Sequence, residues 1–498
     1  MHHEGDGSRA TVKRGGAARA VVFGVPFLLS LACAACIHQM APGRTSPGAA
    51  PSPEVPWTPP AGAVAPPPAP APAPAIPPDL LANASNWGLA ELVDLALRNS
   101  PDTRVAWARA RAAAADLGAQ RGAYYPTAVF QTNASKTRGS AVGGQFTFET
   151  ASYNPYLTLN YLLFDFGGRK GAVEESRQAL ISANWSHGAV LQDQVLKVEQ
   201  AYFQYVYARA LEQAEQASLK EAQGSLDAAT RRHDAGLSTI ADVLQARTRL
   251  SQAQLALETV QGQIQTIHGV LATAIGLPAN TRFEVETPVN DLPLQEAAAE
   301  VERAIEEAQA RRPDLAAARA DALKAEAHER TVRSLGLPSF ASTFNAGRIY
   351  YSPSGLHQDT WSGSVLLTIP VFNGMTWQYN RLKAQEQREE ARARLDSLQQ
   401  EITYQVWSSY YNLQTAAQKV ATSKDLIDSA RQSYEVISAR YKAGVGSILD
   451  LLTATSDLES ARAQEAQART DWFLSMAQLA HDTGTLSPPG AGTTKGNP

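Results

Sequence analysis

Cysteine is almost absent from this sequence of 498 residues. Its two cysteines, Cys33 and Cys36, both lie within the first forty residues. The rest of the chain therefore has no disulfide and no metal site built on cysteine. The nine histidines are scattered and form no His-Glu-x-x-His pair, which argues against a metal-dependent hydrolase.

Blocks of like charge and phosphate-binding loops are also missing. Lys and Arg number 44 and Asp and Glu 48, which gives a net charge of −4 without a long run of one sign. Proteins that bind nucleic acid carry clustered basic residues, so this pattern argues against nucleic acid as a partner. The glycines of residues 167–171 lack the spacing of a phosphate-binding loop and fit a turn from strand to helix. We therefore expect no enzyme activity, no catalytic residues and no cofactor.

The N-terminal segment has the layout of a secretory signal. Lys13, Arg14 and Arg19 precede an apolar run over residues 21–35. That run is shorter than the ~20 apolar residues that a membrane-spanning helix needs. We predict that residues 1–35 are a cleaved signal peptide.

The two cysteines indicate a lipid anchor. Ala34 and Ala35 directly before Cys36 resemble a bacterial lipobox, in which the cysteine sulfur receives a diacylglycerol and the new N-terminus a further acyl chain. The pattern departs from the usual one because Cys33 stands where leucine is expected, three residues before Cys36. Cys33 is therefore an alternative lipidation site, and an ordinary signal peptide cleaved near Ala35 is a further alternative.

A segment rich in proline and alanine follows the cysteines. Residues 65–72 consist of proline and alanine only, and such a sequence favours an extended polyproline II conformation without a core. We interpret residues 36–86 as a lipid-anchored linker, with a proline-motif docking role as the alternative. Residues 485–498, also rich in proline and glycine, are predicted to be a disordered tail.

The body of the chain is a tandem repeat. Leu163-Phe164-Asp165 recurs 208 positions later as Val371-Phe372-Asn373, and the motif of residues 232–237 recurs at the same offset as residues 440–445. Such self-similarity indicates one structural unit used twice. We assign the first structural repeat to residues 87–294 and the second to residues 295–484.

Each repeat is predicted to contain a helix, two strands and two further helices. The first helix covers residues 89–122 and ends before Pro126, since proline disfavours helix at the residue before it. Apolar and polar residues alternate as in strands over residues 127–135, 154–163, 339–351 and 361–371.

Very long helices are predicted over residues 168–235 and 375–443. At ~1.5 Å per residue each would be on the order of 100 Å long, so each needs a partner helix along its length. Apolar residues recur every seven positions in the second of them, which is typical of a coiled coil. These residues are Val406, Leu413, Val420, Ile427, Tyr434 and Tyr441.

The four predicted strands are too few to close a barrel within one chain. Four strands cannot form a closed barrel, and an open sheet edge in lipid leaves backbone groups unpaired at a cost of several kcal/mol each. Three chains would supply twelve strands, enough for a barrel around an aqueous lumen. We therefore predict a mixed α/β membrane protein: a trimeric 12-stranded β-barrel continued by a long α-helical coiled-coil tunnel. A soluble β-sandwich with its apolar faces inward is the alternative.

Several motifs together resemble the TolC-type outer-membrane factors. They are the segment from Trp87 to Pro101, the Ala-Gly turns at 235–236 and 443–444, and Ala-Ile-Gly-Leu-Pro at 274–278. The resemblance implies a homotrimer in the bacterial outer membrane whose tunnel extends into the periplasm. There it would dock, through a periplasmic adaptor (membrane fusion) protein, on an inner-membrane pump of an efflux or type I secretion system. It leaves the cargo open, and a lipid-anchored coiled-coil scaffold without transport is the rival function.

The turns between the paired helices are the candidate sites. Glycine suits the left-handed residue that ends a helix, and Gly236 and Gly444 stand at such positions. Asp242 and Asp450 then complete capping-box patterns that begin at Thr239 and Ser447. The resemblance implies that the two aspartates form a periplasmic gate, and that adaptors dock on Ala235, Gly236, Leu237, Ala443, Gly444 and Val445. Capping alone is the alternative role for the aspartates.

Replacing Cys36 with Ser should abolish labelling by a palmitate analogue, because serine offers no sulfur for the diacylglycerol. Trimers should still form, since the barrel would supply the main attachment to the membrane. Metabolic labelling and electrophoresis of unheated samples measure the two effects. Labelling that survives Cys36→Ser but disappears in Cys33→Ser would move the anchor to Cys33.

Overall fold

The computed structural model describes residues 87–141, 143, 145–286, 301–352 and 354–486. The predicted signal peptide, Cys33, Cys36 and the linker lie outside the described residues, as do the junction of the two repeats and most of the predicted tail. Leu486, the last described residue, is buried against the body, so ordered structure continues two residues into the segment predicted as tail.

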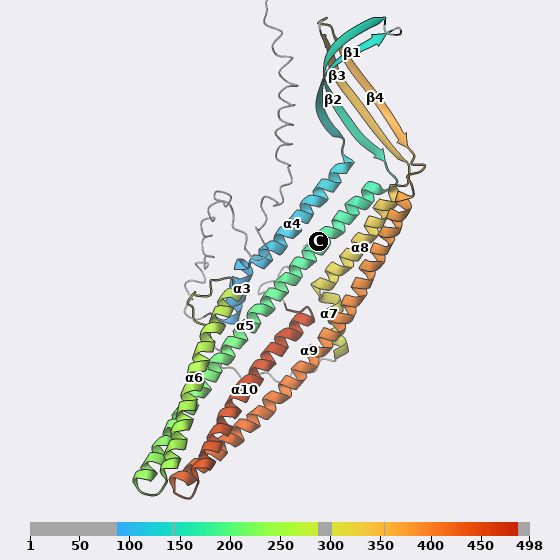
Figure 1. The fold of residues 1–498 in the computed structure, drawn as a ribbon. Coiled ribbons are helices and arrows are strands. Elements are labelled where there is room, and N and C mark those ends of the chain that lie inside the picture. The colour runs from blue at the N-terminus through green and yellow to red at the C-terminus, as the bar shows by residue number, and fades with distance from the viewer. Residues whose placement is uncertain (1–86, 142, 144, 287–300, 353, 487–498) are drawn as a thin grey trace, which may run out of the picture. The chain divides into compact units, whose positions relative to one another are not determined.

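The described chain repeats one order of elements. Each half has two short helices, two strands, a helix of 67 residues and a helix of 35 residues (Figure 1). The first half comprises α3 (Leu89–Asn99), α4 (Pro101–Arg121), the short 3-10 turn η1 (Gly122–Tyr124), β1 (Thr127–Ala141), β2 (Phe146–Phe164), α5 (Gly168–Asp234) and α6 (Ile240–Ala274). The second comprises α7 (Val301–Arg311), α8 (Pro313–Ser334), β3 (Ser339–Ser352), β4 (His357–Thr368), α9 (Thr376–Lys442) and α10 (Ile448–Asp482).

The prediction of a single helix over residues 89–122 is wrong, because the helix is interrupted at Ser100. Ser100 has an extended ψ of 126°, and its N–H still donates to Ala96 O at 2.8 Å. Pro101 has no N–H and its ring clashes with a helical conformation of the preceding residue, so α3 ends there and α4 begins. The second repeat breaks in the same way at Arg312, before Pro313.

The four strands form one antiparallel sheet in the order β1-β2-β3-β4. Phe130 lies opposite Leu157, Leu157 opposite Ala346, and Ala346 opposite Trp361, so these residues share one face. The predicted strand bounds are too short at the turns, where β1 continues to Ala141 and β2 begins at Phe146. Apolar alternation stops before those residues, whereas the backbone ladder continues through polar and charged positions.

The long helices pack in pairs, α5 with α6 and α9 with α10, while α5 and α10 join the two pairs. Val406, Leu413, Val420 and Tyr441 of the predicted heptad are buried. Leu413 and Val420 of α9 pack against Trp472 of α10. These contacts confirm the coiled-coil prediction for α9.

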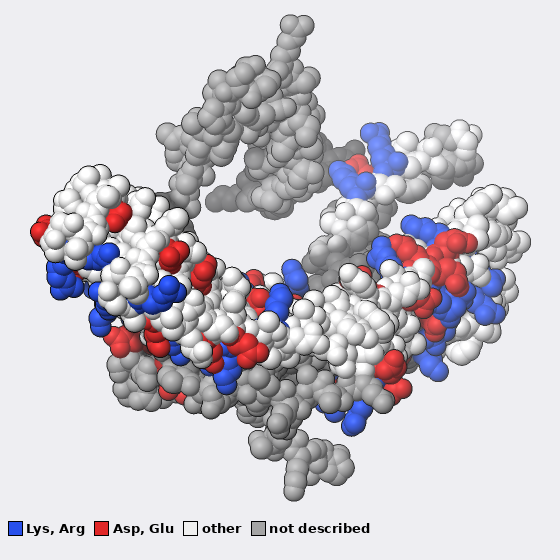
Figure 2. Space-filling view, turned by 90° about the horizontal axis from the view of Figure 1, so that it is seen from below, with Lys and Arg blue, Asp and Glu red and all other residues white. Residues whose placement is uncertain are grey.

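Surface charge is mixed in sign. Figure 2 shows acidic and basic side chains interspersed on the face seen from the lower end of Figure 1. Ion pairs also link α8 and α9, such as Arg388 with Glu329 at 2.7 Å and Arg392 with Glu326 at 2.7 Å. This face therefore offers no broad basic patch for a polyanion.

A buried ion pair joins the two halves of the chain. Arg462 of α10 donates to both carboxylate oxygens of Glu221 of α5, at 3.0 and 2.8 Å. Both side chains are more than four-fifths buried. The positions one repeat away are Gln254 and Ser429, which carry no charge. The two repeats therefore share a fold but differ in how their helices are held to neighbours.

Replacing Arg462 with Gln should lower the free energy of unfolding by on the order of 2 kcal/mol, because it leaves the Glu221 carboxylate buried without its partner. The double variant Glu221→Gln/Arg462→Gln should cost less, since both charges are gone. Thermal dissociation midpoints measure both. Arg431→Gln is the matched control, because its pair with Asp428 is half exposed and should contribute less than about 1 kcal/mol. Equal losses in the single and double variants would contradict a net charge-pair contribution.

Candidate functional site

One face of the sheet is apolar and exposed. Trp361, Val365 and Phe130 expose 77%, 69% and 69% of their surface in the isolated chain. Leu157 lies next to Phe130 on the same face, and Leu367 continues the row along β4. A contiguous apolar sheet face of this kind needs another apolar surface or lipid to cover it.

The opposite face carries amide and hydroxyl side chains that bond to one another. Thr158 donates to Asn345 at 2.7 Å, and Asn345 donates to Ser362 at 3.4 Å. Thr343 and Asn160 form a further pair at 3.0 Å. Alternate residues of a strand point to opposite faces, so the sheet can separate an apolar phase from water.

The turn between α5 and α6 and the turn between α9 and α10, which close two helical hairpins, have the same geometry. In the first, Leu237 N–H donates to Arg232 O at 2.8 Å while Gly236 has a φ of 73°. In the second, Val445 N–H donates to Arg440 O at 3.0 Å while Gly444 has a φ of 87°. This is the Schellman arrangement, in which a left-handed glycine satisfies the last helical carbonyls. All six residues of the predicted docking turns are exposed.

The helix starts after these turns differ. Ser447 Oγ accepts a hydrogen bond from Asp450 N–H at 3.2 Å, as the capping pattern predicts. The prediction is wrong for Thr239, whose hydroxyl donates to the Asp242 carboxylate at 3.1 Å and caps no backbone N–H. Asp450 is exposed and Asp242 is half-buried.

A contact between α5 and α9 joins the two pairs of long helices near these turns. Arg232 of α5 donates to the Tyr441 carbonyl of α9 at 2.5 Å, and its guanidinium lies 4.8 Å from the centre of the Tyr441 ring. Burial raises the pKa of the Tyr441 hydroxyl, Arg232 lowers it and nearby Asp242 raises it further. The heptad pattern had marked Tyr441 only as a core position. Its partner Arg232 lies 209 positions away, so no local pattern reveals the contact.

At the other end of the 35-residue helix α10, a histidine links the repeats. His481 bonds to Asp193 of α5 at 2.9 Å and to Asp482 at 3.0 Å. Burial alone would lower the pKa of His481, but the two carboxylates outweigh it and raise the pKa to about 9. His481 is therefore charged at neutral pH and holds α10 against α5. One scattered histidine in the sequence carries no signal of this role.

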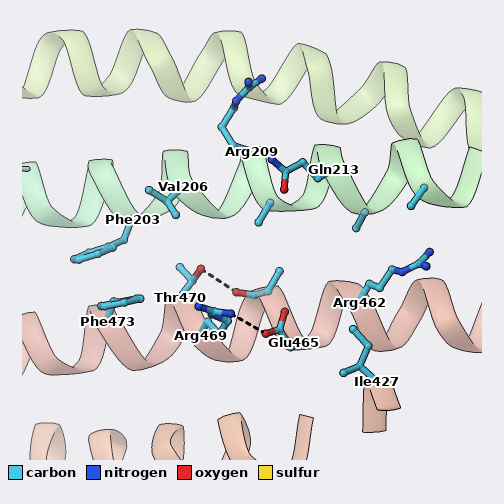
Figure 3. A pocket seen from close by; sticks show the side chains of 14 residues that line it. Phe203, Val206, Arg209, Gln213, Ile427, Arg462, Glu465, Arg469, Thr470 and Phe473 are labelled. Atoms are coloured by element: carbon cyan, nitrogen blue, oxygen red, sulfur yellow. Dashed lines mark hydrogen bonds and ion pairs between the residues drawn. The ribbon is translucent and has the colours of Figure 1, made fainter. Parts of the chain in front are cut away.

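A cavity of about 420 Å³ lies between α5 and α10, with Ile427 of α9 at its side (Figure 3). Phe203 and Phe473 stack across it with ring centroids 4.8 Å apart. Its arginines already have acidic partners: Arg209 pairs with Glu212, Arg462 with Glu221 and Arg469 with Glu465. We therefore assign the cavity to helix packing rather than to a ligand.

No group of three His, Cys, Asp or Glu side chains among the described residues is placed to hold a metal ion. None of the described helices has both the length and the apolar character that crossing a membrane requires.

Known proteins are similar to this chain in sequence and in fold. A family model described as "Outer membrane efflux protein" matches residues 92–277 and 291–485. The protein CyaE of Bordetella pertussis is 31% identical over 417 residues, which cover 80% of this chain and 86% of CyaE. The probable efflux pump outer membrane protein TtgC of Pseudomonas putida is 25% identical over 386 residues, covering 75% of this chain and 78% of TtgC.

A solved structure agrees with the predicted architecture. The outer membrane protein VceC of Vibrio cholerae superposes with a TM-score of 0.71 at 18% sequence identity, covering 80% of this chain and 96% of VceC. The chain thus has the fold of a known outer-membrane protein, as the motifs had predicted. Because the family model matches most of both repeats, the chain belongs to the outer membrane efflux protein family.

Proposed function

We propose that three copies of this chain close into one channel that conducts substrates passively across the periplasm and the outer membrane. The observation that carries the proposal is the sheet, which has one apolar face, one polar face and, among the described residues, no partner for the outer edges of β1 and β4. Pairing β4 of one copy with β1 of the next satisfies both edges, and three copies give twelve strands.

The long helices continue this channel. Each copy contributes two paired helical hairpins, α5 with α6 and α9 with α10. Helices of 67 residues would extend on the order of 100 Å from the barrel. That length suits a tunnel through the periplasm. Family and fold are those of channel proteins rather than of enzymes.

The channel would work as the outer component of a tripartite efflux or type I secretion system. TtgC, a relative, is described as a probable efflux pump outer membrane protein, which favours efflux. The exposed turns at residues 235–237 and 443–445 would bind the periplasmic adaptor protein. Leu237 and Val445 support this role, since both expose more than 60% of their surface in these turns. The adaptor would link the channel to an inner-membrane pump.

The lipid anchor and the gate complete the proposal. A diacylglycerol on Cys36 would fix the linker to the outer membrane. At the tips, Asp242 and Asp450 from three copies would form a ring of carboxylates that constricts the mouth and favours cations. One turn later the residues are Gln245 and Thr453, so the ring has no second acidic layer.

The rival proposal is a lipid-anchored scaffold without transport. A scaffold does not require a sheet with one apolar face and an opposite face of polar side chains that hydrogen-bond to one another. Extraction from outer membranes separates the two proposals: the channel is a trypsin-resistant, heat-modifiable trimer that conducts ions in a planar bilayer. A soluble elongated dimer after removal of the lipid would instead support the scaffold.

Arginine at Val365 should reduce the amount of assembled trimer, because a cation on the lipid side near the bilayer midplane costs on the order of 2 to 4 kcal/mol. Arginine at the adjacent Ser364 is the matched control, since it points to the polar face and should alter conductance instead. Electrophoresis of unheated membrane extracts and planar-bilayer recording measure the two effects. Equal trimer levels in both variants would argue against a membrane barrel.

Replacing Asp242 and Asp450 together with Asn separates gating from capping. If the aspartates only cap, asparagine keeps an acceptor and helix stability should change by a few tenths to ~1 kcal/mol, with unchanged ion flow. We expect instead that cation selectivity falls and that block by multivalent cations is relieved, because the ring loses its charge. Planar-bilayer recordings decide the matter. Unchanged selectivity together with unchanged block would leave capping as the whole role.

A further inference from the structure

The charged side chains of the described strands all lie on one face of the sheet, and it is the apolar face. The register places them there: Arg138 lies opposite Glu149 and Arg348 opposite Asp359, in the same alternation as Phe130 opposite Leu157 and Ala346 opposite Trp361. The polar face has no charged residue in these strands. The charges are Lys136, Arg138, Glu149, Arg348 and Asp359, with His357 beside them.

These residues also gather at one end of the sheet. They flank the β1–β2 and β3–β4 turns, at the end of the strands away from the helices (Figure 1). The apolar row of β4 runs from Leu367 to Trp361, or roughly 20 Å at ~3.3 Å per residue. Asp359 follows two residues beyond Trp361, so the charges begin where this apolar row ends. We call Lys136, Arg138, Glu149, Arg348 and Asp359 the charged rim.

Contacts within the charged rim hold two of its three cations, Arg348 and Lys136, in place. Arg348 donates to both oxygens of Asp359, at 2.5 and 3.1 Å, and Lys136 pairs with Glu149. A guanidinium has five N–H donors, so Arg348 keeps donors beyond those that bind Asp359. Arg138 donates no hydrogen bond to any described residue. With three cations against two carboxylates, the charged rim has one excess positive charge in each chain.

We propose that the charged rim binds the phosphate groups of the phosphorylated glycolipid in the outer leaflet. The inference rests on the proposed function, which places the apolar face in the membrane and the helices in the periplasm. The charged rim then lies at the depth of the outer headgroups. Arginine suits this ligand, because its planar fork binds two phosphate oxygens at once. Tyr153 and Tyr350, whose ring centroids are 6.2 Å apart, lie on the same face beside the charges.

The position of these cations on the apolar face argues against a role in the lumen. A cation that served cargo would have to point toward the polar face, with Thr158 and Asn345, yet Arg138 and Arg348 lie on the same face as the residues of the lipid side. The carboxylates of Glu149 and Asp359 orient the cations but leave an excess that lipid phosphate would neutralise. The polar face therefore remains uncharged while the outer surface attracts anionic headgroups.

The test uses purified full-length trimer and counts the phosphorylated glycolipid molecules that each trimer retains, by native mass spectrometry. Arg138→Gln/Arg348→Gln should weaken retention about tenfold, as expected for the loss of charge-assisted hydrogen bonds. Arg138→Lys alone should retain most of the lipid. Arg431→Gln removes a charge from α9 far along the helix from the sheet and should change nothing. Unchanged retention in the double variant would overturn the proposal.

Addition of defined lipids to delipidated wild-type trimer decides the source of the phosphate. Phosphorylated glycolipid should bind more tightly than the same glycolipid with its phosphates removed, and more tightly than phosphatidylglycerol. Equal binding of the dephosphorylated form would overturn the proposal, and equal binding of phosphatidylglycerol would overturn the assignment to the glycolipid. Bilayer conductance of the same samples separates the two proposals: a conducting trimer without glycolipid binding refutes only the charged rim. These lipid additions also decide the case if the double variant fails to assemble.

Discussion

Backbone N–H and C=O groups in an apolar environment need hydrogen-bond partners, and this constraint governs the whole molecule. Within the sheet, three ladders satisfy the inner edges of β1 to β4. The outer edges of β1 and β4 have no partner in the described chain. In the proposed channel, Trp361 and Val365 face lipid, and those edges then need strands from neighbouring copies. The proposal therefore makes association of copies part of the fold rather than an addition to it.

The long helices need partners for a different reason, which is the burial of their apolar side chains. A helix of 67 residues satisfies its own backbone but cannot cover an apolar row such as Val406, Leu413 and Val420. Pairing with the 35-residue helices covers these rows, and α5 with α10 then joins the two hairpins. The stack of Phe203 on Phe473 and the pair of Arg462 with Glu221 hold that junction.

The two repeats share their backbone geometry but differ in their side-chain contacts. Left-handed glycines recur at 236 and 444, and again at 276 and 484. At the break before the second short helix, however, Ser100 bonds to Gln194 in one repeat, while Arg312 bonds to Asp314 and Gln405 in the other. Backbone geometry is shared because glycine and proline impose it. Side-chain contacts diverge because each repeat faces different neighbours.

The sequence by itself determined the type of each element and the approximate position of most turns. Alternation, heptads and helix-ending glycines act over a few residues, so they can be read locally, and they correctly predicted two strand pairs and two very long helices. Only the tertiary structure decided the extent of β1 beyond residue 135, because its ladder with β2 continues where apolar alternation stops. It also decided the contact of Arg232 with Tyr441 and the charged state of His481. Arg232 lies 209 positions from Tyr441, and Asp193 lies 288 positions from His481, whose other carboxylate partner is the adjacent Asp482. The physical reason is that burial and electrostatics are set by neighbours in space.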